Sequence, residues 1–341
     1  MELDAVFERL KVIAQERRQA QLDSNVEPEA EEQCQCGGGA DPIYVGSLLG
    51  KRQFLICTIC NPRVSCKRCN GTGDLPRFNL TTLRDDILPH ACECMVQEKR
   101  VALLNQANIP EKYLTAEFGF ENLSQLSSDL QSRMTQMQEL AFQFCAHAND
   151  LILHGADSQP KAFMLLFGPV GTGKTHLAVA ALKRLVRNFG HSARFVDFQF
   201  LLSQLRESYS RKSSEDEILR PLREAPVLLI DELGKGRTEN EWQLEKLDDL
   251  INTRYNASRV TFLTTNYLPP ELTYDHTRTG LSKPPANESF WQQSLPERIG
   301  ARMYDRLLEA SVMVSFMGFD SFRRKNAQEF LARYAKNKEQ R

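Results

Sequence analysis

The second half of the chain alternates short apolar runs with amphipathic segments. Apolar runs of strand length occupy residues 163–167, 193–198, 225–232 and 258–266. The segments between them, such as 174–189 and 243–255, repeat apolar residues at helical spacing. Strands that alternate with helices favour a parallel sheet covered by helices on both faces. The pattern therefore predicts an α/β fold for this half.

Three more helices are predicted ahead of it. Residues 1–20 form an amphipathic helix whose apolar stripe must pack on this chain or on a partner. Residues 95–108 form a helix that ends before Pro110, and residues 128–154 form another. Residues 273–294 are rich in Pro, Gly, Ser and Asn, and we interpret them as an exposed loop insertion.

The composition is ordinary for a soluble globular protein. The 341 residues are 41% hydrophobic and 26% charged, which allows two domains or one domain with an appendage. No run approaches the roughly 18 apolar residues that cross a bilayer. The first residues lack the apolar core of a secretion signal. We expect a cytoplasmic protein with no membrane partner.

Charge is distributed unevenly, although the net charge is only −1. Residues 21–33 are acidic and predict a solvated linker. Residues 326–341 form a basic C-terminal tail, which could touch phosphates but is better explained as a solvated helix.

The sequence GPVGTGKT follows the first apolar run and fits the P-loop pattern G-x-x-x-x-G-K-[ST]. Its glycines let backbone N–H groups turn toward phosphate oxygens, and the next helix adds its N-terminal dipole. Lys174 supplies a positive charge and Thr175 a hydroxyl for Mg²⁺. The predicted nucleotide-binding residues are Gly168, Pro169, Val170, Gly171, Thr172, Gly173, Lys174, Thr175 and His176.

Two carboxylates end the third apolar run. Asp231 is placed to hold the Mg²⁺ shell, and Glu232 is the candidate base that polarises the attacking water. A protein that only binds nucleotide does not need the second carboxylate, so the pair predicts hydrolysis. Asn266 ends the next run and could orient the water or sense the phosphate; the alternative is an ordinary turn residue.

Eight of the nine cysteines form four close pairs, while Cys145 lies in an apolar helical pattern and is expected in the core. Eight thiols in this arrangement suit two closed Cys₄ zinc sites of structural type. A redox dithiol would leave six cysteines unexplained, and disulfides are rare in the cytosol. The candidate ligands are Cys34, Cys36, Cys57, Cys60, Cys66, Cys69, Cys92 and Cys94.

The motifs GPVGTGKTHLAVA, VLLIDELG and FLTTN, in this order and spacing, resemble AAA+ ATPases of the bacterial DnaC-type helicase-loader family, which includes the IstB-type transposition ATPases. The resemblance runs from about residue 109 to 323 and defines an expected ATPase domain at 109–325. It implies an AAA+ P-loop fold, ATP as the nucleotide, and a homo-oligomeric ring or spiral, which we expect to be hexameric.

A ring needs an arginine that completes the site of the neighbouring subunit. Residues 295–310 are predicted as one helix that carries Arg298, Arg302 and Arg306. Related ATPases place the finger arginine in a similar SRL or DRL context, so Arg306 is the first candidate and Arg302 the second. At least one of the three is expected to be a solvated helix charge. Arg323 resembles a C-terminal family arginine that approaches the nucleotide.

Helicase loaders bind single-stranded DNA with the region that precedes the acidic pair. Here that region interleaves aromatic and cationic side chains, which can stack bases and follow a backbone. The residues concerned are Phe198, Phe200, Tyr209, Arg206, Arg211 and Lys212. From the sequence alone, Phe198 and Phe200 are better explained as core residues.

Loader-like proteins often carry a CxxCxxTG…CxC element ahead of the ATPase domain, and residues 34–108 form such a cysteine-rich module here. The resemblance implies one site made of Cys66, Cys69, Cys92 and Cys94. The remaining Cys34, Cys36, Cys57 and Cys60 would form the other, although crossed pairing stays open.

The resemblance implies a protein that binds a replicative DNA helicase through the N-terminal helix and the zinc module and loads it onto single-stranded DNA. The alternative is an IstB-like ATPase that assembles on double-stranded DNA and recruits a transposase. The zinc module favours the loader, because the IstB-like relatives resemble this chain less there. The Asp231–Glu232 pair opposes a third possibility, a P-loop protein without turnover.

Overall fold

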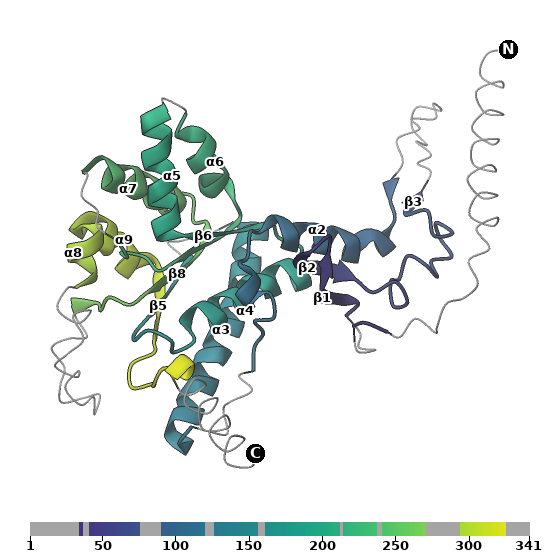
Figure 1. The fold of residues 1–341 in the computed structure, drawn as a ribbon, viewed down its shortest axis with the longest axis horizontal. Helices are drawn as coiled ribbons and strands as arrows, with labels where there is room; N and C mark the ends of the chain where they lie inside the picture. Colours follow the sequence, from purple (N-terminus) through teal and green to yellow (C-terminus); the bar gives the residue numbers. More distant parts are fainter. Residues whose placement is uncertain are drawn as a thin grey trace, which may run out of the picture.

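The computed structural model describes residues 34–36, 41–75, 90–119, 126–155, 161–211, 214–236, 241–270 and 294–324 (Figure 1). The predicted features at 1–20, 21–33 and 326–341, and the 273–294 insertion apart from Ser294, lie outside these residues.

A parallel sheet with the strand order β6-β7-β8-β5-β9 forms the centre of the molecule. Four of its strands are the predicted apolar runs, and β5, β7 and β8 are buried along their whole length because helices cover both faces. The strands are β5 (Phe163–Phe167), β6 (Ala193–Asp197), β7 (Val227–Asp231), β8 (Val260–Thr265) and β9 (Ser311–Ser315). The predicted α/β fold is confirmed, and β9 was not predicted because it is only partly buried and its sequence, SVMVS, has serine at both ends.

Helices cover the two faces of this sheet in separate groups (Figure 1). One face packs on α4 (Lys174–Phe189), and α3 (Ser128–His154) packs on α4 in turn. The other face carries α5 (Phe198–Arg211), α6 (Asp216–Glu224) and α7 (Glu241–Asn256). The helix predicted at 128–154 is confirmed. No helix in the described part of the chain combines the length and hydropathy needed to span a bilayer.

The single helix predicted at 295–310 is wrong. The chain forms α8 (Leu295–Ile299) and α9 (Ala301–Ala310), which are separated by Gly300 with φ 86° and ψ 148°. This backbone conformation is far from helical. Glycine adopts it readily because glycine has no Cβ. Arg298 therefore lies on α8, and only Arg302 and Arg306 share a helix.

The cysteine-rich module is built from short elements. A hairpin of β1 (Ile43–Leu48) and β2 (Lys51–Ile56) is followed by a small pair, β3 (Asp74–Leu75) and β4 (His90–Ala91). A single 3₁₀ turn, η1 (Glu93–Met95), then leads into α2 (Val96–Gln106), which confirms the helix predicted at 95–108. A second turn, η2 (Glu111–Tyr113), leads toward the sheet domain.

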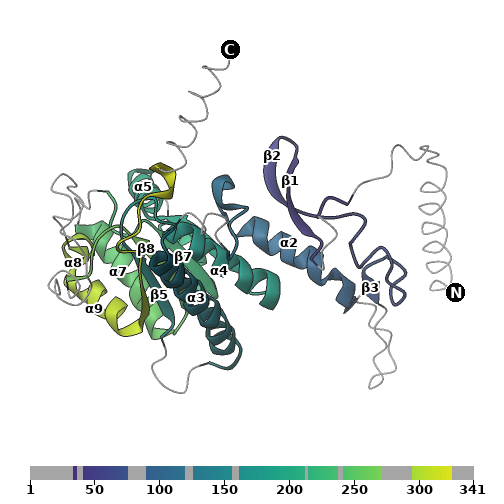
Figure 2. The ribbon, with the colours of Figure 1, turned by 90° about the horizontal axis from the view of Figure 1, so that it is seen from below.

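Helix α2 joins the module to the sheet domain (Figure 2). On one side, the Asn105 side chain bonds the backbone of Phe54 in β2, with its Oδ1 2.9 Å from the nitrogen and its Nδ2 3.0 Å from the oxygen. On the other side, the Phe195 N–H in β6 donates to the Ala107 carbonyl at 2.7 Å. The module is thus held against the sheet domain by directed hydrogen bonds.

Candidate nucleotide-binding and metal sites

The P-loop connects β5 to the buried start of α4. Gly168, Gly171 and Gly173 have φ values of 136°, 81° and 101°, which L side chains rarely adopt. A Cβ on Gly168 would lie 2.9 Å from the Phe316 carbonyl carbon, and one on Gly171 would lie 2.2 Å from Ser321 Oγ. Glycine is therefore required at these positions both by backbone conformation and by the close approach of the chain after β9.

A pocket of about 440 Å³ opens over this loop. Its size falls in the range of small-molecule sites, roughly 300–1,000 Å³. The predicted residues that line it are Val170, Gly171, Gly173, Lys174, Thr175, His176, Glu232 and Asn266. The sequence analysis assigned no role in the site to the other lining residues, which include Tyr113, Thr115, Glu117, Thr264 and Phe322.

Other predicted nucleotide-site residues lie behind the residues that line the pocket. Thr172 is fully buried and donates its hydroxyl proton to the Pro169 carbonyl at 2.9 Å, so it shapes the loop. Asp231 is 5% exposed at the end of β7 and accepts hydrogen bonds from Thr175 Oγ1 at 2.7 Å and Thr264 Oγ1 at 2.5 Å. Gly168 forms the first turn of the loop beside Phe316.

Lys174 lies at the bottom of the pocket and is only 6% exposed. Its Nζ donates to the carbonyls of Gly168 at 2.8 Å and Pro169 at 2.6 Å. Burial lowers the pKa of Lys174 to about 7, although Asp231 and Glu232 act in the opposite direction. A buried ammonium group in a cradle of glycine backbone is suited to the charge of a triphosphate.

The carboxylate of Asp231 and the hydroxyl of Thr175 form an oxygen pair behind the loop. Burial raises the pKa of Asp231, and the hydrogen bonds from Thr264 and Thr175 oppose that rise. Oxygen ligands of this kind are those that Mg²⁺ takes from proteins in nucleotide sites. The residues present therefore fit a magnesium–nucleotide complex.

Glu232 has a left-handed backbone, with φ 59°, at the carboxyl end of the strand. Thr264 Oγ1 accepts from its N–H at 2.9 Å and so fixes this turn. The Glu232 carboxylate lines the pocket together with Asn266, yet it is also ion-paired with Lys235. The sequence patterns did not single out Lys235, whose pKa is raised by this hydrogen bond.

The second wall of the pocket is held by cations from α4. The buried Lys183 Nζ donates to the carbonyls of Leu114 at 2.8 Å and Ala116 at 2.6 Å, and to Glu117 Oε1 at 2.6 Å. Arg187 joins the same Glu117 oxygen at 2.7 Å and reaches Asp41 of the cysteine-rich module at 2.6 Å. The wall of the nucleotide pocket and the base of the module are therefore tied to one helix.

The candidate arginines lie in different surroundings. Arg302 and Arg306 are not among the residues that line the pocket of their own chain, and Arg306 pairs with Asp248 on α7 at 2.6 Å. Arg298 donates to the Gly234 carbonyl at 2.9 Å. Arg323 lines the pocket, 3.5 Å from the Tyr113 hydroxyl.

The aromatic residues proposed to contact DNA divide into two groups. Phe198 is fully buried in the core, whereas Phe200 is 59% and Tyr209 69% exposed. The Tyr209 ring lies 5.3 Å from the ring of Trp242 on α7, which the sequence patterns did not single out. Lys212 lies outside the described residues.

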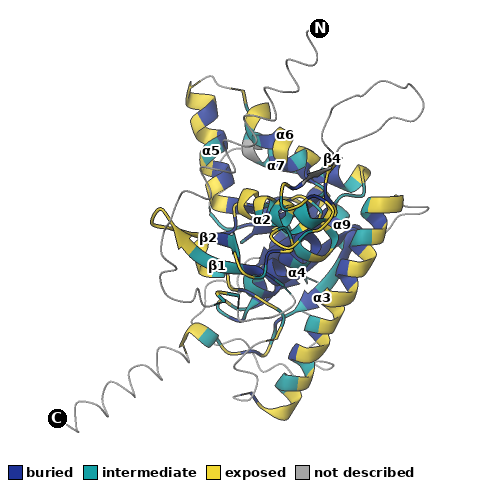
Figure 3. Ribbon diagram, turned by 90° about the vertical axis from the view of Figure 1, so that its right-hand side faces the viewer, coloured by how far each residue is buried: buried dark blue, intermediate teal, exposed yellow. Residues whose placement is uncertain are grey.

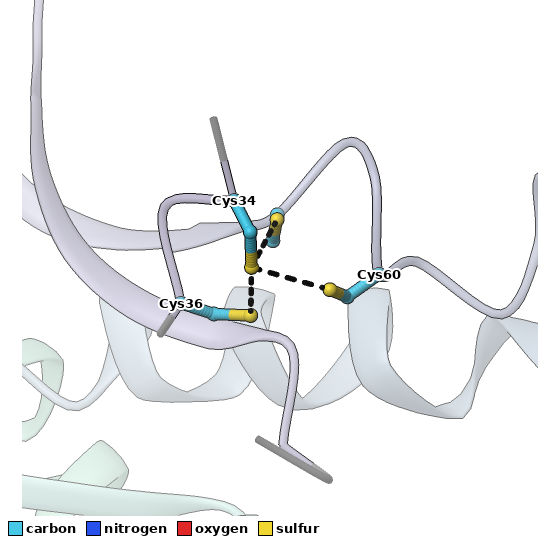
Figure 4. Close-up of side chains that lie close together, drawn as sticks. Cys34, Cys36 and Cys60 are labelled. Carbon is cyan, nitrogen blue, oxygen red and sulfur yellow. Dashed lines mark hydrogen bonds between the residues drawn. The ribbon is translucent and has the colours of Figure 1, made fainter. Parts of the chain in front are cut away.

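The eight paired cysteines form two clusters, each within 4.8 Å across its sulfur atoms. In the first, Cys34 Sγ lies 3.3 Å from Cys36 Sγ and 3.4 Å from Cys60 Sγ (Figure 4). The clusters are Cys34, Cys36, Cys57 and Cys60, and Cys66, Cys69, Cys92 and Cys94. These are the sets that the resemblance implied, and the crossed pairing is not the one observed.

The clusters have the dimensions and charge environment of zinc sites. Four ligands at the usual Zn–S distance of 2.3 Å in a tetrahedron place sulfurs about 3.8 Å apart, and the sulfurs of Cys66 and Cys92 are separated by 3.7 Å. Within the first cluster, backbone hydrogen bonds, first from Cys60, lower the pKa of Cys57 to about 6, whereas hydrogen bonds with Cys34 and Cys36 raise the pKa of Cys60 to about 12. Thiolates at such spacing are the ligands that Zn²⁺ prefers, so the residues fit the metal.

The P-loop strand β5 lies between β8 and β9, the acidic pair ends β7 on the far side of β8, and a polar residue follows β8. These features define the class: this is an AAA+ P-loop ATPase. The family model for the IstB-like ATP binding protein matches residues 92–276. The chain belongs to that family.

Relatives with known names include replication proteins. The replicative helicase loader DnaC of Escherichia coli K12 is 28% identical over 113 residues, which are 33% of this chain and 45% of DnaC. The chain thus spans less than half the length of that relative. The phage-like element PBSX protein XkdC of Bacillus subtilis is 24% identical over 264 residues, which are 76% of this chain and 85% of XkdC. The crystal structure of the DnaC helicase loader is similar to 60% of this chain and 99% of its own, with 22% identity and a TM-score of 0.42.

Proposed function

We propose that this protein is an ATP-dependent loader that binds a replicative DNA helicase and places it on single-stranded DNA in the cytoplasm. The observation that carries the proposal is the joining of the P-loop site to a double Cys₄ module by α2 and Arg187. An ATPase that must act on a partner needs such a fixed attachment between its site and its docking module. The names of DnaC and DnaI, both replicative helicase loaders, support the same assignment.

In the proposed reaction, the P-loop amides and Lys174 hold the triphosphate, and Thr175 with Asp231 would hold Mg²⁺. The metal supplies charge compensation when it is bound. Glu232 accepts the proton of the attacking water, and Asn266 orients that water from the end of β8. Lys235 is ion-paired with one oxygen of this carboxylate, so its ammonium group competes with the water for Glu232.

The surface beside the site is suited to single-stranded DNA. Phe200 and Tyr209 offer ring faces to bases, the half-buried Trp242 supports Tyr209, and the exposed Arg206 can follow the phosphate backbone. Subunits would form a ring or spiral, which we take to be a hexamer, with Arg306 reaching the neighbour's nucleotide. Two structural Zn²⁺ ions would hold the cysteine-rich module together.

One rival has support from the family itself. The matching model describes IstB-like proteins, and an ATPase of transposition would assemble on double-stranded DNA and recruit a transposase. The cysteine-rich module favours the loader, since it supplies a separate docking unit ahead of the ATPase domain.

Binding experiments separate the two proposals. Purified full-length protein with ATP is mixed with the replicative helicase of the same host, and in parallel with fluorescent single- and double-stranded DNA. The loader predicts a stable helicase complex and tighter binding to single-stranded DNA. Preference for double-stranded DNA without helicase binding would instead support the transposition ATPase.

A further inference from the structure

The β1–β2 hairpin ends in a tip that combines a strained turn, exposed leucines and exposed cations. Its turn residues are Leu49 and Gly50, with φ values of 52° and 77°, as in a two-residue type I′ turn. Asparagine or glycine normally precedes the glycine there, because leucine has a steric penalty at positive φ. Leu49 is 99% exposed and Leu48 51% exposed. This strained leucine packs against no side chain in the described part of the chain.

The tip is also positively charged. Lys51 and Arg52 are exposed and make no ion pair within the described residues, and residues 43–56 contain no carboxylate. Two apolar anchors beside two unpaired cations match a partner surface that has an apolar pocket with an acidic rim.

The base of the hairpin is fixed. Ile43 and Phe54 are buried, and Asn105 bonds the Phe54 backbone from α2. Arg187 bonds Asp41 just ahead of β1. Figure 3 shows that exposure is concentrated at the free end of β1 and β2, while the base is covered. An anchor presented on a fixed support loses little entropy when it binds.

We propose that the hairpin tip, Leu48, Leu49, Lys51 and Arg52, is a docking wedge for a protein partner with an acidic-rimmed apolar pocket. This inference rests on the proposed function, under which the partner is the replicative helicase. Leucine provides no ring face for base stacking, so a protein fits the tip better than nucleic acid does.

Because this type of turn prefers asparagine before glycine, the leucine side chain can be removed without weakening the hairpin. Leu49→Asn converts the turn to the preferred Asn-Gly sequence, so the thermal unfolding midpoint should stay equal or rise. Binding to the purified helicase hexamer, measured by surface plasmon resonance, should weaken by about tenfold or more, as expected for an anchor residue. Leu48→Asn should weaken it likewise, and Lys51→Glu with Arg52→Glu should slow association and flatten its salt dependence. Leu153→Asn is the matched control, because Leu153 is 60% exposed on α3 and should be neutral.

The outcomes are distinct. Wild-type affinity in Leu48→Asn and Leu49→Asn, with a wild type that binds helicase, would overturn the wedge and leave the loader intact. A wild type that does not bind the helicase would overturn both. If Leu49→Asn instead alters self-association in sedimentation or affinity for single-stranded DNA, the occupant is a second copy or nucleic acid, and the wedge is also overturned.

Discussion

At the scale of single residues, the proposed base Glu232 has a competing partner. The Thr264 hydroxyl accepts a hydrogen bond from the Glu232 N–H, and Lys235, three residues later, is ion-paired with the Glu232 carboxylate at the pocket. Both side chains are partly exposed, so their ion pair can open readily. Under the proposed reaction, Lys235 therefore competes with the attacking water for this carboxylate.

Replacing Lys235 tests this description. Lys235→Ala should raise basal ATP turnover, because no ammonium group then competes with the water for the Glu232 carboxylate. A partly exposed ion pair is worth about 0.2–1 kcal/mol, so the increase should be at most about fivefold. Lys235→Arg keeps the pair and is the control. A steady-state phosphate-release assay that shows lower turnover in Lys235→Ala would mean that Lys235 helps the reaction.

The P-loop and acidic-pair variants separate binding from hydrolysis. Lys174→Ala should abolish nucleotide binding, since it removes the buried cation of the P-loop. Glu232→Gln should keep binding and slow turnover by about a hundredfold or more, the usual contribution of a general base. Fluorescent-nucleotide titration and phosphate release measure the two quantities. Normal hydrolysis by Glu232→Gln would refute its role as base.

At the scale of elements, the strands and helices that the sequence predicted correctly are those with a clear local hydrophobic periodicity. Buried strands such as 163–167 and long amphipathic helices such as α3 follow directly from apolar spacing. The β1–β2 hairpin was missed because Leu49–Gly50 is not a recognised turn sequence. The break at Gly300 was missed because one glycine is also tolerated inside a helix.

The position of Arg306 on α9 supports a test of the neighbouring-subunit role. Arg306→Ala should lose ATPase activity, and mixing with Lys174→Ala subunits should restore part of it, because each variant supplies the group that the other lacks. Asp248→Asn breaks the same intrachain pair and is the control, since it should keep activity. Equal loss in Asp248→Asn, without complementation, would show that Arg306 acts through α7 only.

At the scale of the whole molecule, contacts between distant segments build the site. Asp41, Glu117 and helix α4 are far apart in sequence. In the fold, Lys183 of α4 pairs with Glu117, and Arg187 of α4 pairs with both Glu117 and Asp41. The predicted P-loop residues and Asn266 come together because parallel strands end at one edge. The sequence assigned no site role to the wall at 113–119 or to Trp242, because their contacts form only in the folded chain.

Metal content tests the two clusters together. Metal analysis of protein purified without chelator should give about two zinc ions per chain, one for each Cys₄ cluster. Cys36→Ser and Cys69→Ser should each lower the content by one. Each variant should also unfold at a lower temperature, because the metal replaces a hydrophobic core in so small a module. A content of one or none in the wild type would contradict two zinc sites.

The central claim is tested most directly by helicase loading itself. Circular single-stranded DNA coated with single-strand-binding protein is incubated with helicase, ATP and this protein, and helicase retained on the circles is counted after gel filtration. The account predicts retention that requires the wild-type protein and is lost with Lys174→Ala. Equal retention without this protein, or with Lys174→Ala in its place, would contradict it.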